Sequence, residues 1–406
     1  MNVTERFLKY VSIDTESDPN SETTPSTAKQ LNLANVLVEE MKALGIEDAH
    51  VDRYGVVYGT IPGDAKAETI GFVAHMDTSP DLTGANVNPR IIKNYDGKPI
   101  VLNEAKQIIM DPKDFPSLHE NVGEDLIVTD GTTLLGGDDK AGVAEIMVMA
   151  EALMSQPRSA HGTVKIAFTP DEEVGRGADN FDIKGFGAEY AYTVDGGDIR
   201  DVNYENFNAA AAVVKIHGLS IHPGAAKNKM LNSQLIAMEF NALLPVHEDP
   251  ACTEGYEGFH HLTNIHGVCE ETTLQYIIRN HNEEIFERQK QQFMNAAAYL
   301  NKKYPEGTVE CTITHSYTNM RSYIEKDMRV IDTVKQAIQD LGMTPISTPI
   351  RGGTDGARLT YDGLPCPNIG TGGYNCHGKF EYVSIPRMEK IVELLLRIVE
   401  NISTHA

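Results

Sequence analysis

The chain has 406 residues, with 58 acidic side chains against 35 Lys and Arg, and its formal net charge is −23. This excess of acid argues against nucleic acid or an anionic membrane as the main partner, because both are bound through basic surfaces. No apolar stretch approaches the roughly 20 residues needed to cross a bilayer. We therefore expect a globular protein, and the length favours two domains over one.

The N-terminal segment and the cysteines predict a cytoplasmic protein. Residues 1–14 mix charged and apolar side chains and lack the apolar run of a secretory signal. The five cysteines are odd in number and have no CxxC spacing. A disulfide framework is therefore not expected, and a reducing compartment is.

The first half of the chain predicts helices that alternate with buried strands. Amphipathic patterns and a clear helix after a glycine-rich segment predict helices over residues 4–11, 26–45 and 141–154. Continuous apolar runs predict buried strands over residues 69–74, 163–168 and 190–194. This alternation indicates an α/β layer with a mostly parallel central sheet.

The pattern changes near residue 208. Strands are predicted at 209–217, 258–267, 271–281 and 309–316, with helices at 232–244 and 283–303. The order β-α-β-β-α-β is that of an α+β ferredoxin-like unit, which can fold as an inserted domain. Helices predicted at 323–341 and 386–402 then return to the first fold. The predicted domains are thus 1–207 with 317–406, and an insertion at 208–316.

Predicted strands of the first domain end in side chains that can bind a cation. These residues are His75 and Asp77, Glu172 and Glu173, and Asp195. The carboxyl ends of strands in an open α/β sheet face one crevice, so these groups should converge. Asp138, before a predicted helix, and His377, among turn residues, extend the set. Imidazole combined with carboxylate suits zinc or another divalent first-row ion.

Each candidate also has a simpler explanation when taken alone. The acids at 171–173 could be an ordinary helix start, favoured by the helix dipole. His75 could be a satisfied buried histidine, Asp138 a helix cap, and Asp195 a turn residue. Their common position at strand ends is what favours a shared site.

Glu172 and Glu173 are neighbours with different expected tasks. Adjacent side chains on an extended chain point to opposite faces. One of the two can therefore hold a cation while the other holds a proton.

The motifs, in order, resemble those of the M20 family of di-zinc metallopeptidases, over nearly the whole chain. They are His75-Met76-Asp77, Gly137-Asp138-Asp139-Lys140, Asp171-Glu172-Glu173-Val174-Gly175, Asp195-Gly196-Gly197 and Cys376-His377-Gly378. Within the family, segments 169–177 and 350–359 look most like the tripeptide aminopeptidases.

The resemblance implies two zinc ions per subunit and a ligand for each. Asp138 would bridge the two ions. His75 and Asp195 would complete one site, and Glu173 and His377 the other.

The resemblance also implies two catalytic side chains outside the ligand set. Asp77 would hydrogen-bond His75, fixing its ring and raising its basicity. Glu172 would take a proton from the attacking water and return it to the leaving amine. Asp139 would stay outside the metal shell.

By the same resemblance, the inserted domain is expected to be a lid and a dimer surface. His222 matches the family's lid histidine, which stabilises the oxyanion, although a plain loop histidine is the alternative. Arg279 or Arg351 could hold the C-terminal carboxylate of a peptide by a bidentate pair, and a surface salt bridge is the alternative for each. Asn280 departs from the acid expected after the arginine, which weakens transferred details around Arg279.

The implied function is a cytoplasmic, homodimeric aminopeptidase that releases the N-terminal residue of tripeptides. A dipeptidase or an N-acyl-amino-acid deacylase would share all five ligands and Glu172. A catalytically silent peptide-binding protein is a further alternative, against which the intact Glu172 and the complete ligand set argue.

Overall fold

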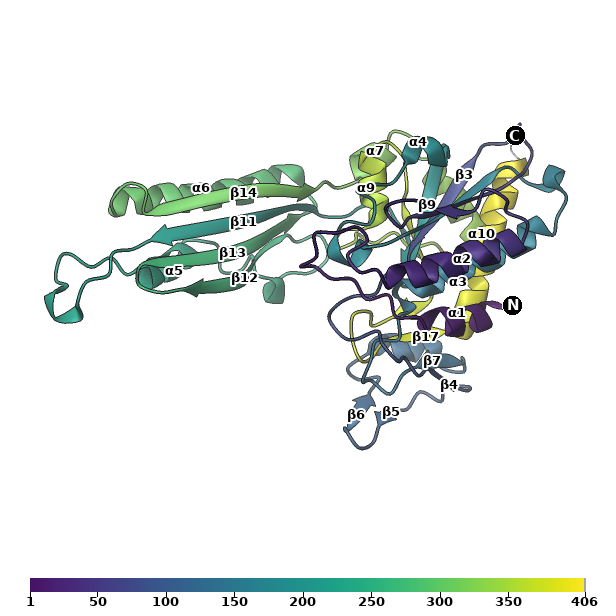
Figure 1. Ribbon diagram of the computed structural model, residues 1–406, viewed down its shortest axis with the longest axis horizontal. Coiled ribbons are helices and arrows are strands. Elements are labelled where there is room, and N and C mark those ends of the chain that lie inside the picture. Colours follow the sequence, from purple (N-terminus) through teal and green to yellow (C-terminus); the bar gives the residue numbers. More distant parts are fainter. Residues whose placement is uncertain (405–406) are drawn as a thin grey trace. The chain divides into compact units, whose positions relative to one another are not determined.

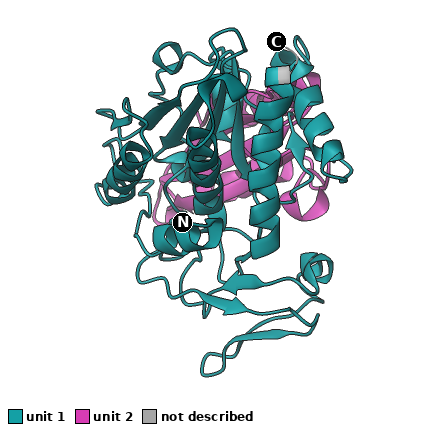
Figure 2. Cartoon of the chain, turned by 90° about the vertical axis from the view of Figure 1, so that its right-hand side faces the viewer, with its two compact units in different colours: residues 1–204, 322–348, 354–406 teal, residues 205–321, 349–353 magenta. Residues whose placement is uncertain are grey.

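In the computed structural model, which describes residues 1–404, the chain divides into two units (Figure 2). Unit 1 consists of Met1–Tyr204, Ser322–Thr348 and the part of the chain from Thr354 onward. Unit 2 consists of Glu205–Arg321 and Pro349–Gly353. The sequence predicted the insertion at 208–316 and did not predict that Pro349–Gly353 belongs with it.

A seven-stranded sheet forms the centre of unit 1, in the order β1-β2-β8-β3-β9-β15-β10. Its parallel strands are β8 (Val164–Thr169), β3 (Ile70–His75), β9 (Tyr190–Gly196) and β15 (Asn368–Gly370). Its antiparallel strands are β1 (His50–Val51) and β2 (Val57–Ile61) at one side of the sheet and β10 (Val202–Asn203) at the other. Every residue of β3 is buried, as expected of a strand covered on both faces. The predicted mostly parallel α/β sheet is confirmed.

Helix α3 (Gly137–Met154), predicted over 141–154, packs directly on β3 and β9. The contact is close at Gly142, where an added Cβ would lie 2.0 Å from the carbonyl oxygen of Val194. Helices α1 (Val3–Val11) and α10 (Ile385–Thr404) pack against α3 in turn (Figure 1). Elsewhere in unit 1 lie α2 (Gln30–Ala43), α4 (Ile183–Phe186) and α9 (Asp355–Tyr361).

The helix predicted over 323–341 is interrupted. Two helices stand there instead, α7 (Arg321–Ile324) and α8 (Arg329–Asp340). The Asp327 carboxylate accepts a hydrogen bond from the backbone N–H of Arg329 at 3.2 Å. A side chain that satisfies a free N–H in this way favours a new helix start over a continuous helix.

Unit 1 also contains a small four-stranded antiparallel sheet. Its strands, in sheet order, are β16 (Gly373–Tyr374), β17 (Tyr382–Ser384), β7 (Leu126–Val128) and β4 (Arg90–Ile92). A hairpin of β5 (Ile100–Asn103) and β6 (Ile108–Met110) adjoins it in sequence. Leu118, Leu126 and Tyr382 are part of the buried core of this region. The sheet joins residues near 126 to residues near 382, and this pairing later bears on the site.

Unit 2 is a four-stranded antiparallel sheet with two helices. Its elements, in chain order, are β11 (Asn208–His217), α5 (Ser233–Ala242), β12 (Phe259–Gly267), β13 (Glu271–Asn280), α6 (Glu283–Lys303) and β14 (Val309–Tyr317). The sheet order β12-β13-β11-β14 is that of the predicted ferredoxin-like unit. Phe240, Tyr276 and Phe293 belong to a buried cluster within this unit, so unit 2 has a core of its own.

Candidate metal centre

Neighbouring strands of unit 1 deliver the first candidate side chains to one edge of the sheet. His75 is the last residue of β3, which lies between β8 and β9. Asp195 lies near the end of β9, and β8 is followed at once by a turn that leads into the short 3₁₀ segment η3 (Glu172–Val174). The parallel register places all three strand ends at the same edge of the sheet, where ligands of α/β proteins bind.

The side chain of Asp138 lies between the two histidines. Its Oδ1 is 2.9 Å from Nε2 of His75, and its Oδ2 is 3.3 Å from Nε2 of His377. Each histidine has a second carboxylate: Asp195 Oδ1 is 3.6 Å from His75 Nε2, and Glu173 Oε2 is 3.0 Å from His377 Nε2. One carboxylate thus faces two His–carboxylate pairs, with one oxygen toward each.

Two groups of side chains could each hold a divalent cation. Ligand atoms of His75, Asp138 and Glu173 all lie within 4.8 Å of one another, and so do those of His75, Asp139 and Asp195. The second group contains Asp139, which the resemblance placed outside the metal shell, whereas His377 joins the cluster through its contacts with Asp138 and Glu173. Two imidazoles and three carboxylates form a donor set typical of zinc and other first-row ions.

In the absence of ions, the pKa values of both histidines and of Asp195 are raised, as expected of a cluster that attracts positive charge. Hydrogen bonds to Asp138 and Glu173 raise the pKa of His377 to about 11. Burial lowers the pKa of His75, yet the charges of Asp195 and Asp138 beside it raise that pKa well above its ordinary value. Burial raises the pKa of Asp195 to about 7. These side chains therefore bind protons more tightly than usual when no ion is bound, and cation binding must release those protons.

Asp77 holds the backbone of the acidic turn as well as the His75 ring. Its buried carboxylate accepts the N–H of Glu172 at 3.0 Å and that of Glu173 at 3.2 Å. The Nδ1 atom of His75 lies 3.1 Å from the Asp77 carbonyl oxygen and 3.5 Å from its carboxylate. Asp77 therefore orients groups from two strand ends at once.

Glu172 is held beside the cluster with its proton affinity increased. Burial raises the pKa of Glu172 well above its ordinary value, and the negative charge of Asp195 adds to that effect while His75 opposes it. A carboxyl group with such a pKa is suited to take up a proton during a reaction.

Asp171 has a defined role that its sequence context did not reveal. Its carboxylate accepts the N–H of Ser26 at 2.7 Å and the side-chain amide of Gln30 at 2.7 Å, and Gln30 in turn accepts the N–H of Asp171 at 3.1 Å. The residue has a left-handed backbone, with φ of 59°. This turn sets the direction in which Glu172 and Glu173 leave the end of β8.

Two further acids outside the predicted ligand set, of which the sequence motifs indicated only Asp139, also accept main-chain N–H groups of the site. Asp139 accepts the N–H of His75 at 3.1 Å and that of Gly142 at 3.3 Å. Glu381 accepts N–H groups from the segment that carries Asp138. Burial raises the pKa of Asp139 well above its ordinary value and that of Glu381 to about 7. Apart from the bond from Gly142, these contacts join segments far apart in the sequence, so no local sequence pattern predicts them.

The three predicted substrate-binding residues all belong to unit 2. His222 is exposed, and its Nδ1 accepts the N–H of Gly224 at 3.1 Å. Arg279 donates through Nη1 to carbonyl groups of its own sheet, and its guanidinium lies over the ring of Tyr317. Arg351 donates to the carbonyls of Gly255 and Glu257 at 2.7 and 2.8 Å. The structure brings the five proposed ligands, Asp77 and Glu172 together in unit 1, and these three residues lie outside that group.

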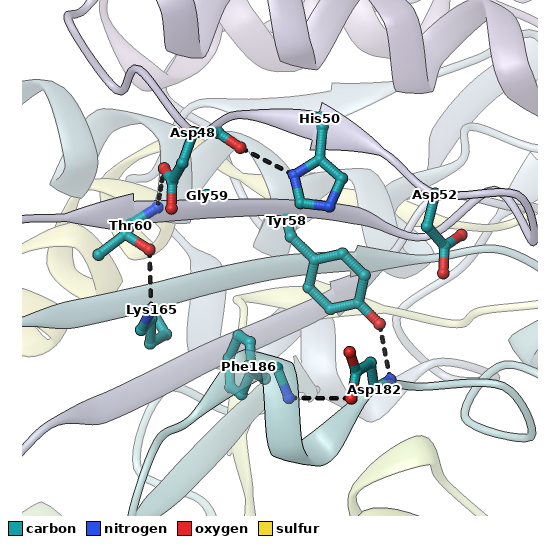
Figure 3. Close-up of a pocket in the computed structure, with 10 residues that line it drawn as sticks. Asp48, His50, Asp52, Tyr58, Gly59, Thr60, Lys165, Asp182 and Phe186 are labelled. Atoms are coloured by element: carbon teal, nitrogen blue, oxygen red, sulfur yellow. Dashed lines mark hydrogen bonds between the residues drawn. The ribbon is translucent and has the colours of Figure 1, made fainter.

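A separate cavity of about 160 Å³ lies beside β1, β2 and β8 and contains none of the proposed ligands (Figure 3). The hydroxyl of Tyr58 accepts the N–H of Asp182 at 2.9 Å. Lys165 donates to Thr60 at 2.9 Å, and the N–H of Thr60 donates to Asp48 at 2.9 Å. These polar groups are engaged with one another, and we assign the cavity no part in the metal centre.

A mainly parallel α/β sheet with a His–carboxylate cluster at its strand ends is the architecture of a metal-dependent hydrolase. Comparison with known proteins makes the class specific. Residues 131–401 match the model of Peptidase family M20/M25/M40, and the chain belongs to this family.

Relatives match along the full chain. Peptidase T of Alkaliphilus oremlandii (strain OhILAs) is 55% identical over 403 residues, which cover 98% of both chains. The crystal structures of aminopeptidase PepT from Bacillus cereus ATCC 10987 and of a tripeptidase from Staphylococcus aureus Mu50 have TM-scores of 0.77 and 0.78, at 23% and 21% identity. Each covers 99% of this chain and 98% of its own.

A more distant structure has the same fold. It is the YXEP protein of Bacillus subtilis, described as a dinuclear metal-binding peptidase of the M20 family. Its TM-score is 0.65 at 12% identity, over 98% of this chain and 96% of its own. The chain thus has the fold and the family expected from its motifs.

Proposed function

We propose that the protein is an aminopeptidase that hydrolyses the N-terminal peptide bond of tripeptides. The observation that carries the proposal is the Asp138 carboxylate, which has one oxygen toward His75 and the other toward His377. That arrangement fits two divalent cations held close together. The relatives named Peptidase T, aminopeptidase and tripeptidase agree with the substrate that the sequence predicted.

We propose zinc as the ion, with two ions per subunit. Asp138 would contact both ions, His75 and Asp195 would hold one, and Glu173 and His377 would hold the other. When bound, such a pair polarises a carbonyl group and lowers the pKa of a water molecule. The donor set supports zinc without excluding another first-row ion from binding.

Glu172 is the proposed general base. With a raised pKa, its carboxylate can accept the proton of the attacking water and then donate it to the amine that leaves. Asp77 supports this step because it accepts the N–H groups of both Glu172 and Glu173 and so fixes the backbone of the turn that carries them. Glu173 is thereby assigned to a metal ion and Glu172 to the proton.

We propose that unit 2 contributes the remaining groups, as a lid and as the surface of a homodimer. His222 would stabilise the oxyanion. Of the two arginines, Arg279 is the better candidate for the substrate carboxylate. Within residues 1–404 its guanidinium donates hydrogen bonds through Nη1, whereas Arg351 donates to carbonyl oxygens through both terminal nitrogens.

We propose a cytoplasmic location because the cysteines are not paired in disulfides. All five are free in the structure, with Cys366 buried and the others at least partly accessible. Free thiols are stable in a reducing compartment. Among the described residues, no helix has the length and apolar character required to cross a membrane.

The test is a panel of substrates that differ in length and at their ends. Chelator-stripped protein is reloaded with Zn²⁺ and assayed on trialanine, dialanine, tetraalanine and N-acetylalanine. We expect trialanine to have the highest kcat/KM, with alanine and dialanine as its products, and we expect the stripped protein to be inactive. Faster hydrolysis of dialanine or N-acetylalanine would instead identify a dipeptidase or a deacylase.

The Glu172→Gln variant tests the mechanism in the same assay. We expect it to bind Zn²⁺ as the parent does and to lose about 10²–10⁴-fold in kcat, the usual contribution of a general base. Glu39→Gln, at an exposed position of α2, is the matched control and should retain full activity. Near-normal turnover by Glu172→Gln would refute the assignment.

A further inference from the structure

Glu381 is a buried acid outside the proposed ligand set, and it bonds the segment that carries Asp138. Glu381 is 3% exposed. Its Oε2 accepts the N–H groups of Leu135 and Gly136 at 2.8 and 2.9 Å, and its Oε1 accepts the N–H of Asp138 at 3.0 Å. Three main-chain donors on one carboxylate make a strong, geometrically defined anchor.

The chain makes room for this carboxylate at Gly137. A Cβ added there would lie 3.0 Å from Oε1 of Glu381 and 2.6 Å from the side chain of Val383. A larger residue would push the carboxylate away from the N–H groups that it accepts. Gly136 has a φ of 80°, a conformation that turns its N–H toward the same point and that residues with a side chain rarely adopt. The glycine pair before Asp138 therefore serves the Glu381 anchor.

The same residue is tied to the turn that carries His377. Glu381 is four positions after His377, and its N–H donates to the carbonyl of Gly378 at 3.2 Å. The Asn375 side chain donates to the carbonyl of Phe380 at 3.1 Å and closes the turn from the other end. Immediately beyond Glu381, β17 pairs with β7. The backbone position of Glu381 is thus set by the sheet, and the His377 turn is set by the same segment.

We propose that Glu381 is a positioning residue that fixes the spacing between Asp138 and His377. The inference rests on the proposed ligand set, in which these two residues share one cation with Glu173. The other cation shares Asp138 but also depends on His75 and Asp195, which are carried by β3 and β9 and not by the anchored segments. Loss of the anchor should therefore weaken the ion at His377 far more than the ion at His75.

The experiment measures Zn²⁺ binding to chelator-stripped protein by titration against a competing chromophoric chelator. Glu381→Gln keeps the shape of the side chain but places an NH₂ group against main-chain N–H donors. We expect the parent to bind two ions, and we expect the variant to bind one of them about 10–100-fold less tightly, the usual cost of losing a residue that orients a ligand. The affinity for the other ion should fall much less, because Asp138 is the one ligand of that ion on the anchored segment.

Glu124→Gln is the matched control. Glu124 accepts the hydroxyl of Ser384 at 2.6 Å and Nε of Arg387 at 3.1 Å, so it supports the same small sheet without bonding a ligand segment. We expect this variant to keep both zinc affinities. Glu381→Asp keeps the charge but is one methylene shorter, so its zinc affinity should lie between those of the parent and Glu381→Gln. If Glu381→Gln does not fold, the zinc affinities of Glu381→Asp are judged by the same criteria.

Several outcomes would overturn the inference. If Glu381→Gln binds both ions as the parent does, or loses both equally together with a lower melting temperature of the metal-free protein, Glu381 has no role or only a structural one. If the parent itself binds a single ion, the proposed ligand set fails, and the inference falls with it. The two failures are distinguished by the parent's stoichiometry.

Discussion

The carboxylates around the proposed site of unit 1 form two overlapping groups by what they contact. Asp138, Glu173 and Asp195 face imidazole rings, Glu381 accepts main-chain N–H groups, and Asp77 does both. A buried carboxylate must be hydrogen-bonded or paired, because desolvation of its charge is costly. Main-chain donors satisfy it without a side-chain cation that would compete for the metal ligands. This explains how so many acids can surround one site.

Glu145, on α3, belongs to neither group. It is fully buried, and neither carboxylate oxygen has a hydrogen-bond partner within residues 1–404. Burial alone raises the pKa of Glu145 well above its ordinary value. The folded protein therefore keeps this proton at pH values where the unfolded chain has lost it. Stability from this group is complete below about pH 4.5 and decreases as the pH rises toward the folded-state pKa.

Replacement of Glu145 by Gln removes this pH dependence. We expect the free energy of unfolding of Glu145→Gln to increase relative to the parent between pH 5 and pH 8, by at most about 1.4 kcal/mol per pH unit. Urea unfolding of the metal-free proteins at the two pH values measures the difference. Glu151→Gln, at an exposed position of the same helix where the hydrogen bond from Arg6 lowers the pKa, should not gain with pH. Parallel profiles for Glu145→Gln and the parent would contradict the assignment.

At the scale of elements, the N-terminal part of α2 is bonded to the end of β8. Asp171 makes this connection through Ser26 and Gln30, two residues that precede or begin the helix. The predicted helix over 26–45 begins only at Gln30, because the preceding residues form the turn that meets Asp171. The helix therefore supports the acidic turn directly.

Asp171→Asn tests this support. An amide cannot accept every hydrogen bond that the carboxylate accepts, so we expect a loss of about 2 kcal/mol in the free energy of unfolding, within the range for bonds to a charged group. We also expect a decrease in kcat, because Glu172 follows directly. Asp182→Asn is the control, since Asp182 accepts the N–H of Gly185 at the start of α4, away from the site. If the two variants had equal kcat, Asp171 would have no influence on Glu172.

At the scale of the whole molecule, the two units have separate cores and unequal shares of the proposed chemistry. All five proposed ligands lie in unit 1, while unit 2 has its own buried cluster around Phe240 and Phe293. A ligand stabilises only the unit that binds it, by about 2.7 kcal/mol when its free concentration is 100 times Kd. Metal should therefore act on one unit alone.

Differential scanning calorimetry measures this directly. We expect two transitions in the zinc-loaded protein, and we expect addition of a chelator to lower the melting temperature of one of them by several degrees. The unaffected transition is assigned to unit 2. A single transition, or an equal shift of both, would mean that the units unfold together or that metal also binds outside unit 1.

Much of the fold could be predicted from the sequence because its signals are local. Buried strands such as β3 appear as continuous apolar runs, and the order of elements in unit 2 follows from alternating patterns and turn residues. The polar residues that end β3 and β9 stand out against those runs. The ligand roles of Asp138 and His377 came from the resemblance of their motifs, and these roles stay a prediction that the zinc titration tests.

Only the tertiary structure decided how the site is held together. The bond between Asp171 and Ser26 spans 145 positions of the chain, and the bond between Glu381 and Leu135 spans 246. The joining of Pro349–Gly353 to unit 2 is equally non-local. A local pattern reports which face of an element is buried, but it contains no information on which distant N–H a side chain will meet. That choice follows from packing of the whole fold, and it is where Asp171 and Glu381 acquire their roles.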